Sequence, residues 1–128
     1  MSGPIPAGSA IRLMPYESAI GIAEGIETAI SAYAIFNVPT WAGISAKGIE
    51  RWEPPKDAEE VWIFGDNDRT FTGQLAAYKL AYRLVETGKK VYVAIPRIKG
   101  ADWNDVLTLH GTQDARKLVE ELVSEYKK

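Results

Sequence analysis

Acidic side chains stand at three points of this sequence where a parallel sheet would bring them together. They follow three short apolar runs: Glu24 ends the first, Asp66 and Asp68 end another, and Asp102 with Asp105 follows the last after a loop. Each separation is close to the roughly 30 or more residues of a strand–helix–strand step. Because ligands sit at the carboxyl ends of parallel strands, we expect these acids to share one edge of the sheet.

A cluster of carboxylates at one edge needs positive charge to offset its self-repulsion. No Lys or Arg is interleaved inside the acidic motifs, so a divalent cation is the natural neutraliser. Hard oxygen ligands select Mg²⁺ or Mn²⁺, which keep several waters and bridge to substrate phosphates. One such ion polarises a phosphoryl oxygen and activates an attacking oxygen, and two clamp both ends of an in-line displacement. The acids therefore predict phosphate chemistry.

Each acid also has a purely structural interpretation. The Asp66-Asn67-Asp68 segment is typical of a turn, since Asp and Asn side chains bond nearby backbone amides. Asp102 suits a helix N-cap with Asp105 as its first-turn partner, and Glu24 would complement a helix N-terminus. Taken singly, each acid fits its structural role better, so the metal hypothesis depends on the acids as a set.

Strands and helices alternate along the chain in a pattern that would position the acids. Apolar runs predict strands over residues 19–23, 38–44, 61–65 and 91–95, with a short edge strand over 10–14. Helical spacing and stop signals predict helices over 25–36, 45–52, 72–86 and 102–110, and a last one after Asp114. The alternation predicts an α/β fold, a mostly parallel Rossmann-like sheet of about four strands with helices on both faces.

Two predicted helices carry an apolar stripe, which in an amphipathic helix faces the core. The stripes comprise Ile26, Ala29, Ile30 and Tyr33 in the first helix, and Leu75, Tyr78, Tyr82 and Val85 in the third. Trp41 and Trp62 are expected in the core, and Trp103 is expected to pack under the adjoining loop. His110 suits a C-terminal cap on the short helix over 102–110.

The composition limits the kinds of protein and of site. The 128 residues are 46% hydrophobic and 25% charged, as in an ordinary soluble domain. The absence of cysteine and the single histidine exclude disulfides, thiolate zinc sites and cysteine nucleophiles, so any metal is held by oxygen. The net charge of −2 provides no global field that would recruit nucleic acid. With no membrane span or signal peptide, we expect a cytoplasmic protein with a flexible leader over 1–9 and one domain over 10–128.

Three blocks of the sequence resemble the Toprim domain, the fold shared by topoisomerases, bacterial-type primases and some nucleases. They are GIAEGIETAISA from Gly21, VWIFGDNDRTFTGQLAA from Val61 and GADWNDVL from Gly100. The chain is most similar to the Toprim module of phage- and plasmid-encoded primases or primase-helicases, where a stretch like AIRLMP precedes the glutamate motif. The resemblance covers the chain from about Ala10 onward.

The resemblance implies roles for the acids, residue by residue. Glu24 matches the Toprim glutamate, a general acid/base or metal ligand. Asp66 and Asp68 match the metal-binding D-x-D pair, with Gly73 as its trailing glycine. Asp102 corresponds to the first residue of an acidic pair that many primases place after the following strand, and so joins the expected metal ligands.

The chain departs from the primase pattern at two positions. Thr28 stands where many bacterial primases have an aspartate four residues after the glutamate, with Glu27 one residue earlier. Asn104 stands where a second carboxylate is common, although Asp105 is adjacent. These departures bear on whether a second metal ion binds.

The resemblance implies the Mg²⁺- or Mn²⁺-dependent catalytic domain of a DNA primase, performing nucleotidyl transfer for RNA primer synthesis in the replication of a phage, plasmid or prophage. Its partners would be single-stranded DNA template, nucleoside triphosphates and the remaining primase or helicase domains of a parent protein. With neither a zinc module nor a second domain with a basic groove, we expect little or no priming by these residues alone. Lys47, Arg69, Arg97 and Lys99 would contact a nucleic-acid or substrate phosphate backbone, with plain surface charge as the alternative.

Three other functions fit parts of the pattern. A Toprim nuclease would use the same acids and a metal-bound water to hydrolyse phosphodiesters. A phosphoaspartate phosphatase or receiver domain shares the D-x-D-x-T pattern of residues 66–70, although in those phosphatases the motif usually ends the first strand. A non-catalytic binding module would show no affinity for divalent metal.

Overall fold

The computed structural model describes residues 9–108 of the chain. The predicted last helix after Asp114 and the predicted cap His110 lie outside these residues, as does nearly all of the predicted leader. Within the described residues, no helix is long and apolar enough to cross a membrane.

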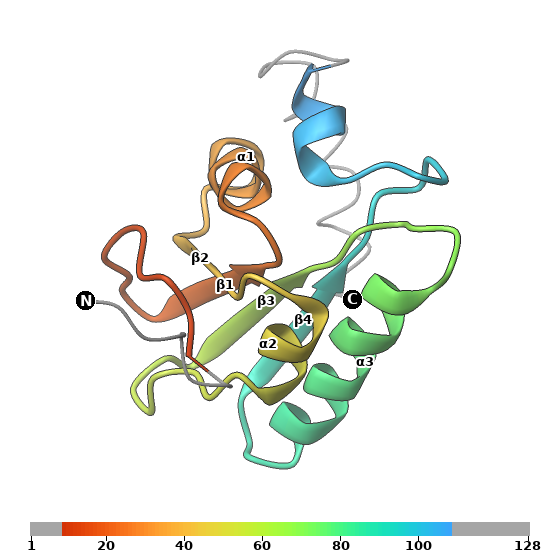
Figure 1. Ribbon diagram of the computed structural model, residues 1–128. Helices are drawn as coiled ribbons and strands as arrows, with labels where there is room; N and C mark the ends of the chain where they lie inside the picture. Colours follow the sequence, from red (N-terminus) through yellow and green to blue (C-terminus); the bar gives the residue numbers. More distant parts are fainter. Residues whose placement is uncertain (1–8, 109–128) are drawn as a thin grey trace, which may run out of the picture.

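A four-stranded parallel sheet forms the centre of the molecule (Figure 1), as predicted. Its strands, in the order β2-β1-β3-β4, are β1 (Ala19–Ala23), β2 (Thr40–Ala42), β3 (Glu60–Phe64) and β4 (Lys90–Ala94). The register pairs Ile22 of β1 with Trp41 of β2 and with Ile63 of β3. The two central strands are buried almost throughout, which explains why they read as continuous apolar runs.

The sheet is smaller at its β2 edge than predicted. The strand expected over 38–44 is confined to three residues, and Pro39 before it has no amide hydrogen to donate to a ladder. The prediction of an edge strand over 10–14 was wrong. Only Ile11 pairs there, in an isolated antiparallel bridge with Ala42 in which each amide donates to the other's carbonyl.

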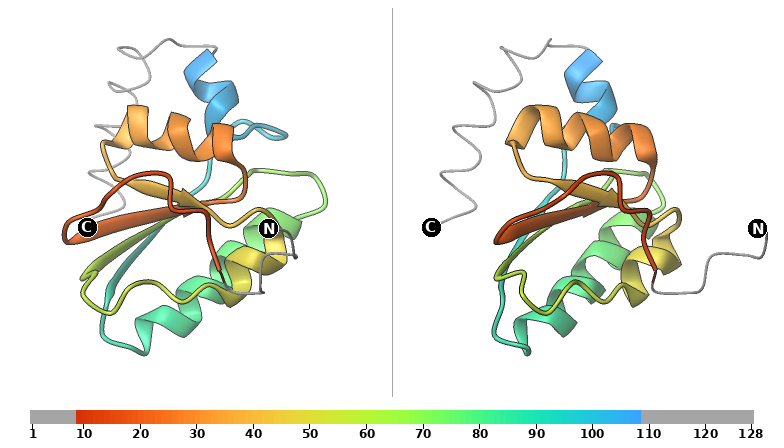
Figure 2. Two further views of the ribbon diagram at one scale, coloured as in Figure 1. Left: turned by 60° about the vertical axis from the view of Figure 1, so that its left-hand side comes forward. Right: turned by 90° about the vertical axis from the view of Figure 1, so that its left-hand side faces the viewer.

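Helices cover both faces of the sheet, as the two views of Figure 2 show. On one face lie α1 (Ile26–Phe36) and a short helix over 103–108, and on the other lie α2 (Ala46–Arg51) and α3 (Thr72–Val85). These bounds agree with the predicted helices to within one residue, apart from the part of 102–110 beyond Thr108.

Each face has its own hydrophobic core. Under α1, the rings of Trp62, Phe64 and Trp103 are fully buried, and Phe36 lies edge-on to Trp103 at 4.9 Å. The indole of Trp103 also donates to Ala94 O at 3.0 Å, which joins the 103–108 helix to β4. Under α2 and α3, the other core contains isoleucines of β1 and β3 together with Trp41 and Trp52. Trp41 and Trp62 are therefore in the core, as predicted, and Trp103, which was predicted to pack under the loop, is part of the core as well.

The apolar stripes that predicted α1 and α3 do not face the core, since only Ala29 of their members is buried. The other members of both stripes are 42–75% exposed: Ile26, Ile30, Tyr33, Leu75, Tyr78, Tyr82 and Val85. The buried faces carry mostly small residues, such as Ala29 and Ala32 in α1 and Ala76 and Ala77 in α3. The sheet supplies the larger side chains, which are the rings of Trp62 and Phe64 under α1 and isoleucines such as Ile20 and Ile63 under α3. A side chain at Gly21 would collide with Phe64, because its Cβ would lie 2.6 Å from that ring. Small helix residues then fit against large sheet residues at ordinary packing density.

Candidate metal centre

The carboxyl ends of the four strands place the predicted acids along one edge of the sheet (Figure 1). Because all strands are parallel, the residues that follow them share this edge in the order of the strands. The start of α2, which contains Lys47, follows β2, and Glu24 follows β1. Asp66 and Asp68 follow β3, and the segment leading to Asp102 follows β4. The sheet therefore brings together the acids that the spacing predicted.

Asp66 has the most unusual environment at this edge. Its Oδ1 atom is buried and has no hydrogen-bond partner. Burial raises the pKa of Asp66 to about 6, and the negative charges of Glu24, Asp102, Asp68 and Asp105 add to the effect in that order. Every charged group that moves this pKa is itself an acid, so the site is one where a cation would be stabilised.

Glu24 lies beside this carboxylate at the end of β1. It is partly buried, and burial followed by the charge of Asp68 raises its pKa above the usual range. Its backbone carbonyl accepts from Ile44 N at 2.7 Å, which ties it to the turn after β2. Ile44 adopts a positive φ of 75°, an unusual backbone conformation for a β-branched residue. Strain of this kind tends to occur at functional sites.

The carboxylate of Asp68 is held by the start of α3. Its Oδ2 atom accepts from the backbone amide of Gly73 at 2.9 Å. A Cβ atom at Gly73 would lie 3.0 Å from that oxygen and 3.2 Å from Asp66 O, so a larger residue there would push the helix and the aspartates apart by a few tenths of an ångström. Phe71, the residue before α3, adopts a second positive φ, 63°. The predicted trailing glycine thus sets the distance between the helix and the two aspartates.

Two amide side chains that sequence reasoning missed brace the same loop. Asn67 Nδ2 donates to Pro96 O at 2.7 Å, which ties the loop to the segment after β4. Gln74 Nε2 donates to Asn67 Oδ1 and to Asp68 O, both at 3.1 Å. The Oε1 atom of Gln74 is buried without a hydrogen-bond partner, as is Asp66 Oδ1. The available sequence signal was the position of Asn67 between two acids.

Asp102 and Asp105 form a reciprocal cap on the 103–108 helix. Asp105 N donates to Asp102 Oδ1 at 2.8 Å, and Asp102 N donates to Asp105 Oδ2 at 3.0 Å. The structural interpretation of Asp102 as an N-cap is therefore confirmed, and its charge still reaches Asp66. Asn104 Oδ1 accepts from Ser31 Oγ at 3.0 Å, which attaches this helix to α1.

The predicted basic residues surround the acidic edge. Lys47 lies in the first turn of α2, whose N-cap Ser45 accepts from Gly48 N at 3.0 Å. Lys99 Nζ lies 5.4 Å from the centre of the Phe71 ring, beside the start of α3. Arg69 is exposed in the loop between β3 and α3, and Arg97 follows β4. Their proposed phosphate contacts remain predictions.

The residues at this edge fit a divalent cation that depends on substrate for part of its coordination. Within residues 9–108, no group of three or more His, Cys, Asp or Glu is arranged to hold a metal ion. The donors are nevertheless hard oxygens, and one of them, Asp66 Oδ1, is buried and unpartnered. Mg²⁺ is commonly held by only one or two carboxylates together with waters and substrate phosphates. The site therefore suits an ion that arrives with a phosphate ligand.

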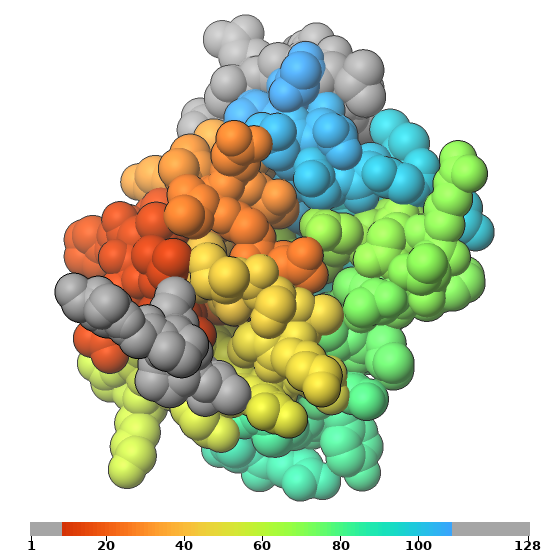
Figure 3. All heavy atoms as spheres, viewed as in Figure 1, coloured from red at the N-terminus to blue at the C-terminus, as the bar shows by residue number. Residues whose placement is uncertain are grey.

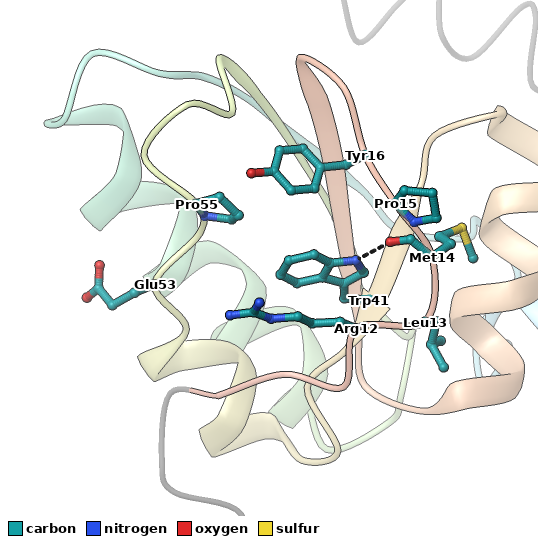
Figure 4. Close-up of a pocket in the computed structure, with 8 residues that line it drawn as sticks. All are labelled: Arg12, Leu13, Met14, Pro15, Tyr16, Trp41, Glu53 and Pro55. Carbon is teal, nitrogen blue, oxygen red and sulfur yellow. Dashed lines mark hydrogen bonds between the residues drawn. The ribbon is translucent and has the colours of Figure 1, made fainter.

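A groove of about 650 Å³ elsewhere on the surface is not lined by any of these acids (Figure 4). The guanidinium of Arg12 lies 5.4 Å from the ring of Trp41, whose indole nitrogen donates to Met14 O at 2.8 Å. Tyr16 lies edge-on to the same indole at 5.6 Å. Its polar side chains have partners, since Tyr16 donates to Asp57 and Glu53 accepts from Arg83, whereas the acidic edge holds an unpartnered carboxylate oxygen and is the stronger candidate site.

A parallel α/β sheet with a glutamate after its first strand and an aspartate pair after its third defines the class of protein. The chain belongs to the Toprim family, whose domain model matches residues 19–113. Comparison with curated proteins gave no match.

Two solved structures share the fold at 18% sequence identity. One is the Aquifex aeolicus primase, comprising zinc-binding and RNA polymerase domains, with a TM-score of 0.58 over 81% of this chain. The other is a DNA primase domain from Pseudomonas aeruginosa, with a TM-score of 0.52 over 73% of this chain. The matched regions cover only 26% and 30% of those two chains.

Proposed function

We propose that this chain is the metal-dependent catalytic Toprim domain of a DNA primase, which transfers nucleotides from nucleoside triphosphates to an RNA primer on single-stranded DNA. The observation that carries the proposal is the buried, unpartnered Oδ1 of Asp66 among four other acids. Membership of the Toprim family and the fold shared with two primases support it. The replication system would be that of a phage, plasmid or prophage.

The acids would divide the work of the transfer. Asp66 and Asp68 would hold Mg²⁺ or Mn²⁺, joined by Asp102, and the bound ion would neutralise charge on the triphosphate. Glu24 would position this ion or accept the proton of the primer hydroxyl as its oxygen bonds to the α-phosphorus and pyrophosphate leaves. Lys47, on the far side of Glu24, would contact substrate phosphate.

The other basic residues would hold the nucleic acid. Arg69, Arg97 and Lys99 follow β3 and β4 next to the aspartates, where contacts to a phosphate backbone would position template or primer without reading its sequence. Because the chain spans 26% and 30% of the two primase chains it resembles, the remaining contacts would come from other primase or helicase domains. Residues 1–128 alone should therefore synthesise little or no primer.

Metal binding is the first experiment. Isothermal titration with Mn²⁺ in the presence of a nucleoside triphosphate should show binding to the wild-type chain and none to Asp66→Asn. Glu59→Gln is the matched control, because Glu59 is exposed beside the opposite end of β3. Equal affinity in all three proteins would remove the basis of the proposal, and no binding to the wild-type chain would favour a non-catalytic binding module.

Activity distinguishes the remaining alternatives. Joined to its neighbouring domains, the wild-type chain should incorporate labelled ribonucleotides on single-stranded DNA, and Asp66→Asn should not. Release of nucleotides from labelled DNA with Mn²⁺ and without triphosphates would instead identify a nuclease. A hydroxylamine-sensitive phosphoryl group on Asp66 would identify the phosphatase or receiver alternative.

A further inference from the structure

Four residues on the outward face of α3, together with Phe71 just before the helix, form a row of five large apolar side chains. Their exposed fractions are 58% for Phe71, 55% for Leu75, 58% for Tyr78, 75% for Tyr82 and 59% for Val85. The helix lies on the outside of the sheet, beside α2 (Figures 1 and 2), and forms the lower right of the surface seen in Figure 3. Single exposed apolar residues are ordinary, whereas a contiguous row marks an interaction site.

The spacing of this row fits another helix. Its members follow one another at steps of four, three, four and three residues, the heptad pattern with which one helix packs along a second. The residues that α3 buries against its own sheet, such as Ala76, Ala77 and Leu80, lie on the other side of the helix. The helix therefore has two apolar faces, and only one is covered by the described residues.

The charge along this row counts against nucleic acid as its occupant. Gln74 and Ala81 are uncharged neighbours of the row, and Lys79 forms an ion pair with Glu50 at 3.2 Å. Arg83 donates to Glu53 at 2.9 Å and is turned toward the end of α2. A surface that binds single-stranded nucleic acid needs a basic groove that follows the backbone. Along this row only the Phe71 end has a cation on it, Lys99 at 5.4 Å from the ring centre, while Lys79 and Arg83 pair with the glutamates of and after α2.

We propose that a second copy of this chain docks on this face, with α3 packed against α3 about a two-fold axis. Since an aromatic side chain offers roughly 150–250 Å², the five side chains expose on the order of 500 Å². Two copies would then bury about 1,000 Å², the size at which specific interfaces begin. Such a pairing uses the same patch twice, and Tyr and Phe are enriched in the cores of such contacts.

An antiparallel arrangement centred on Tyr78 matches large side chains with smaller ones. It sets Leu75 against the partner's Tyr82 and Phe71 against the partner's Val85. Phe71 N donates to Asp68 O at 3.3 Å, so the second copy would lie next to the acidic edge. The dimer does not depend on the proposed catalytic activity, because no acid of the site forms part of the contact.

Sedimentation equilibrium of the full 128-residue chain tests the proposal. An interface of this size should give a monomer–dimer equilibrium between about 1 and about 100 µM. Tyr82→Asp should raise the dissociation constant at least about tenfold, because it buries an unpaired charge in the contact. Tyr33→Asp, a change at a 42% exposed tyrosine on the opposite face of the sheet, should leave it unchanged.

A cysteine cross-link gives a second readout that does not depend on the effect of a buried charge. The chain has no cysteine, so Tyr78→Cys carries a single thiol. A short bismaleimide should join two Tyr78→Cys chains across the two-fold axis and should not join two Tyr33→Cys chains. A wild-type chain that stays monomeric at the highest concentration, or a dimer indifferent to Tyr82→Asp, would overturn the proposal. So would a monomer whose binding to oligo(dT) falls about tenfold with Tyr82→Asp, since the row would then stack on bases.

Discussion

Replacing Asp66 by asparagine should make the metal-free protein more stable while abolishing its response to metal. At neutral pH the wild-type carboxylate is charged, partly buried and surrounded by acids, and its Oδ1 has no partner. Its pKa of about 6 lies well above the 3.8 of an unperturbed aspartate, and the difference corresponds to about 3 kcal/mol. Because the group is only partly buried, solvent screening reduces the expected gain to about 1–2 kcal/mol.

The sign of the pH dependence follows from the direction of this shift. Between about pH 4 and about 6 the folded state keeps the proton that the unfolded chain has lost, so the free energy of unfolding falls as pH rises. This decrease in the free energy of unfolding is complete above about pH 6. Asp66→Asn lacks this titration, so its advantage over wild type should be full at pH 7.5, about half as large near pH 5 and absent near pH 4.

Urea unfolding measured with and without Mn²⁺ separates the two effects. At a metal concentration of about 100 times the dissociation constant, the wild type should gain about 2.7 kcal/mol and the variant should gain nothing. Glu59→Gln, at an exposed carboxylate, should match wild type with and without the ion. A metal-free Asp66→Asn that is less stable than wild type at pH 7.5 would refute the reasoning, since it would show that the charge is compensated.

Three further predictions test how the edge is built. Gly73→Ala brings a methyl group to 3.0 Å from Asp68 Oδ2, so it should cost about 1–3 kcal/mol in urea unfolding and weaken Mn²⁺ binding. Asn67→Ala removes the hydrogen bond to Pro96 O and should lower the free energy of unfolding by about 1–2 kcal/mol. Unchanged stability would show that this hydrogen bond does not stabilise the fold. Ser45→Ala removes the N-cap of α2 and should cost about 1 kcal/mol while leaving Mn²⁺ titrations as in wild type.

The strands were predictable because their burial is a property of short segments. Residues such as Val61 and Ile63 form apolar runs between breaking residues, and such runs have a stable place only inside a sheet covered on both faces. The faces of the helices were not predictable in the same way. Hydrophobicity alone favours burying Tyr78 and Tyr82, whereas close packing on the isoleucines of β1 and β3 selected Ala76 and Ala77.

At the acidic edge, too, some features were predictable from the sequence and others were not. Positions of Glu24, Asp66 and Asp68 relative to strand ends predicted that they would meet, because parallel strands end at one edge. The spacing alone did not indicate which carboxylate oxygens are left free to bind a ligand. Asp102 Oδ1 is committed to a helix cap and Asp68 Oδ2 to Gly73, while Asp66 Oδ1 is buried without a partner.

The sequence by itself thus determined the element order, the parallel α/β class and the acids at the ends of the strands, since these depend on local patterns and on chain direction. Only the tertiary structure decided which acid is left unpartnered, that Asn67 and Gln74 brace the loop, and which side of α3 faces solvent. The physical reason is that each of these depends on contacts between segments far apart in sequence, where side-chain volume and hydrogen-bond partners are settled together.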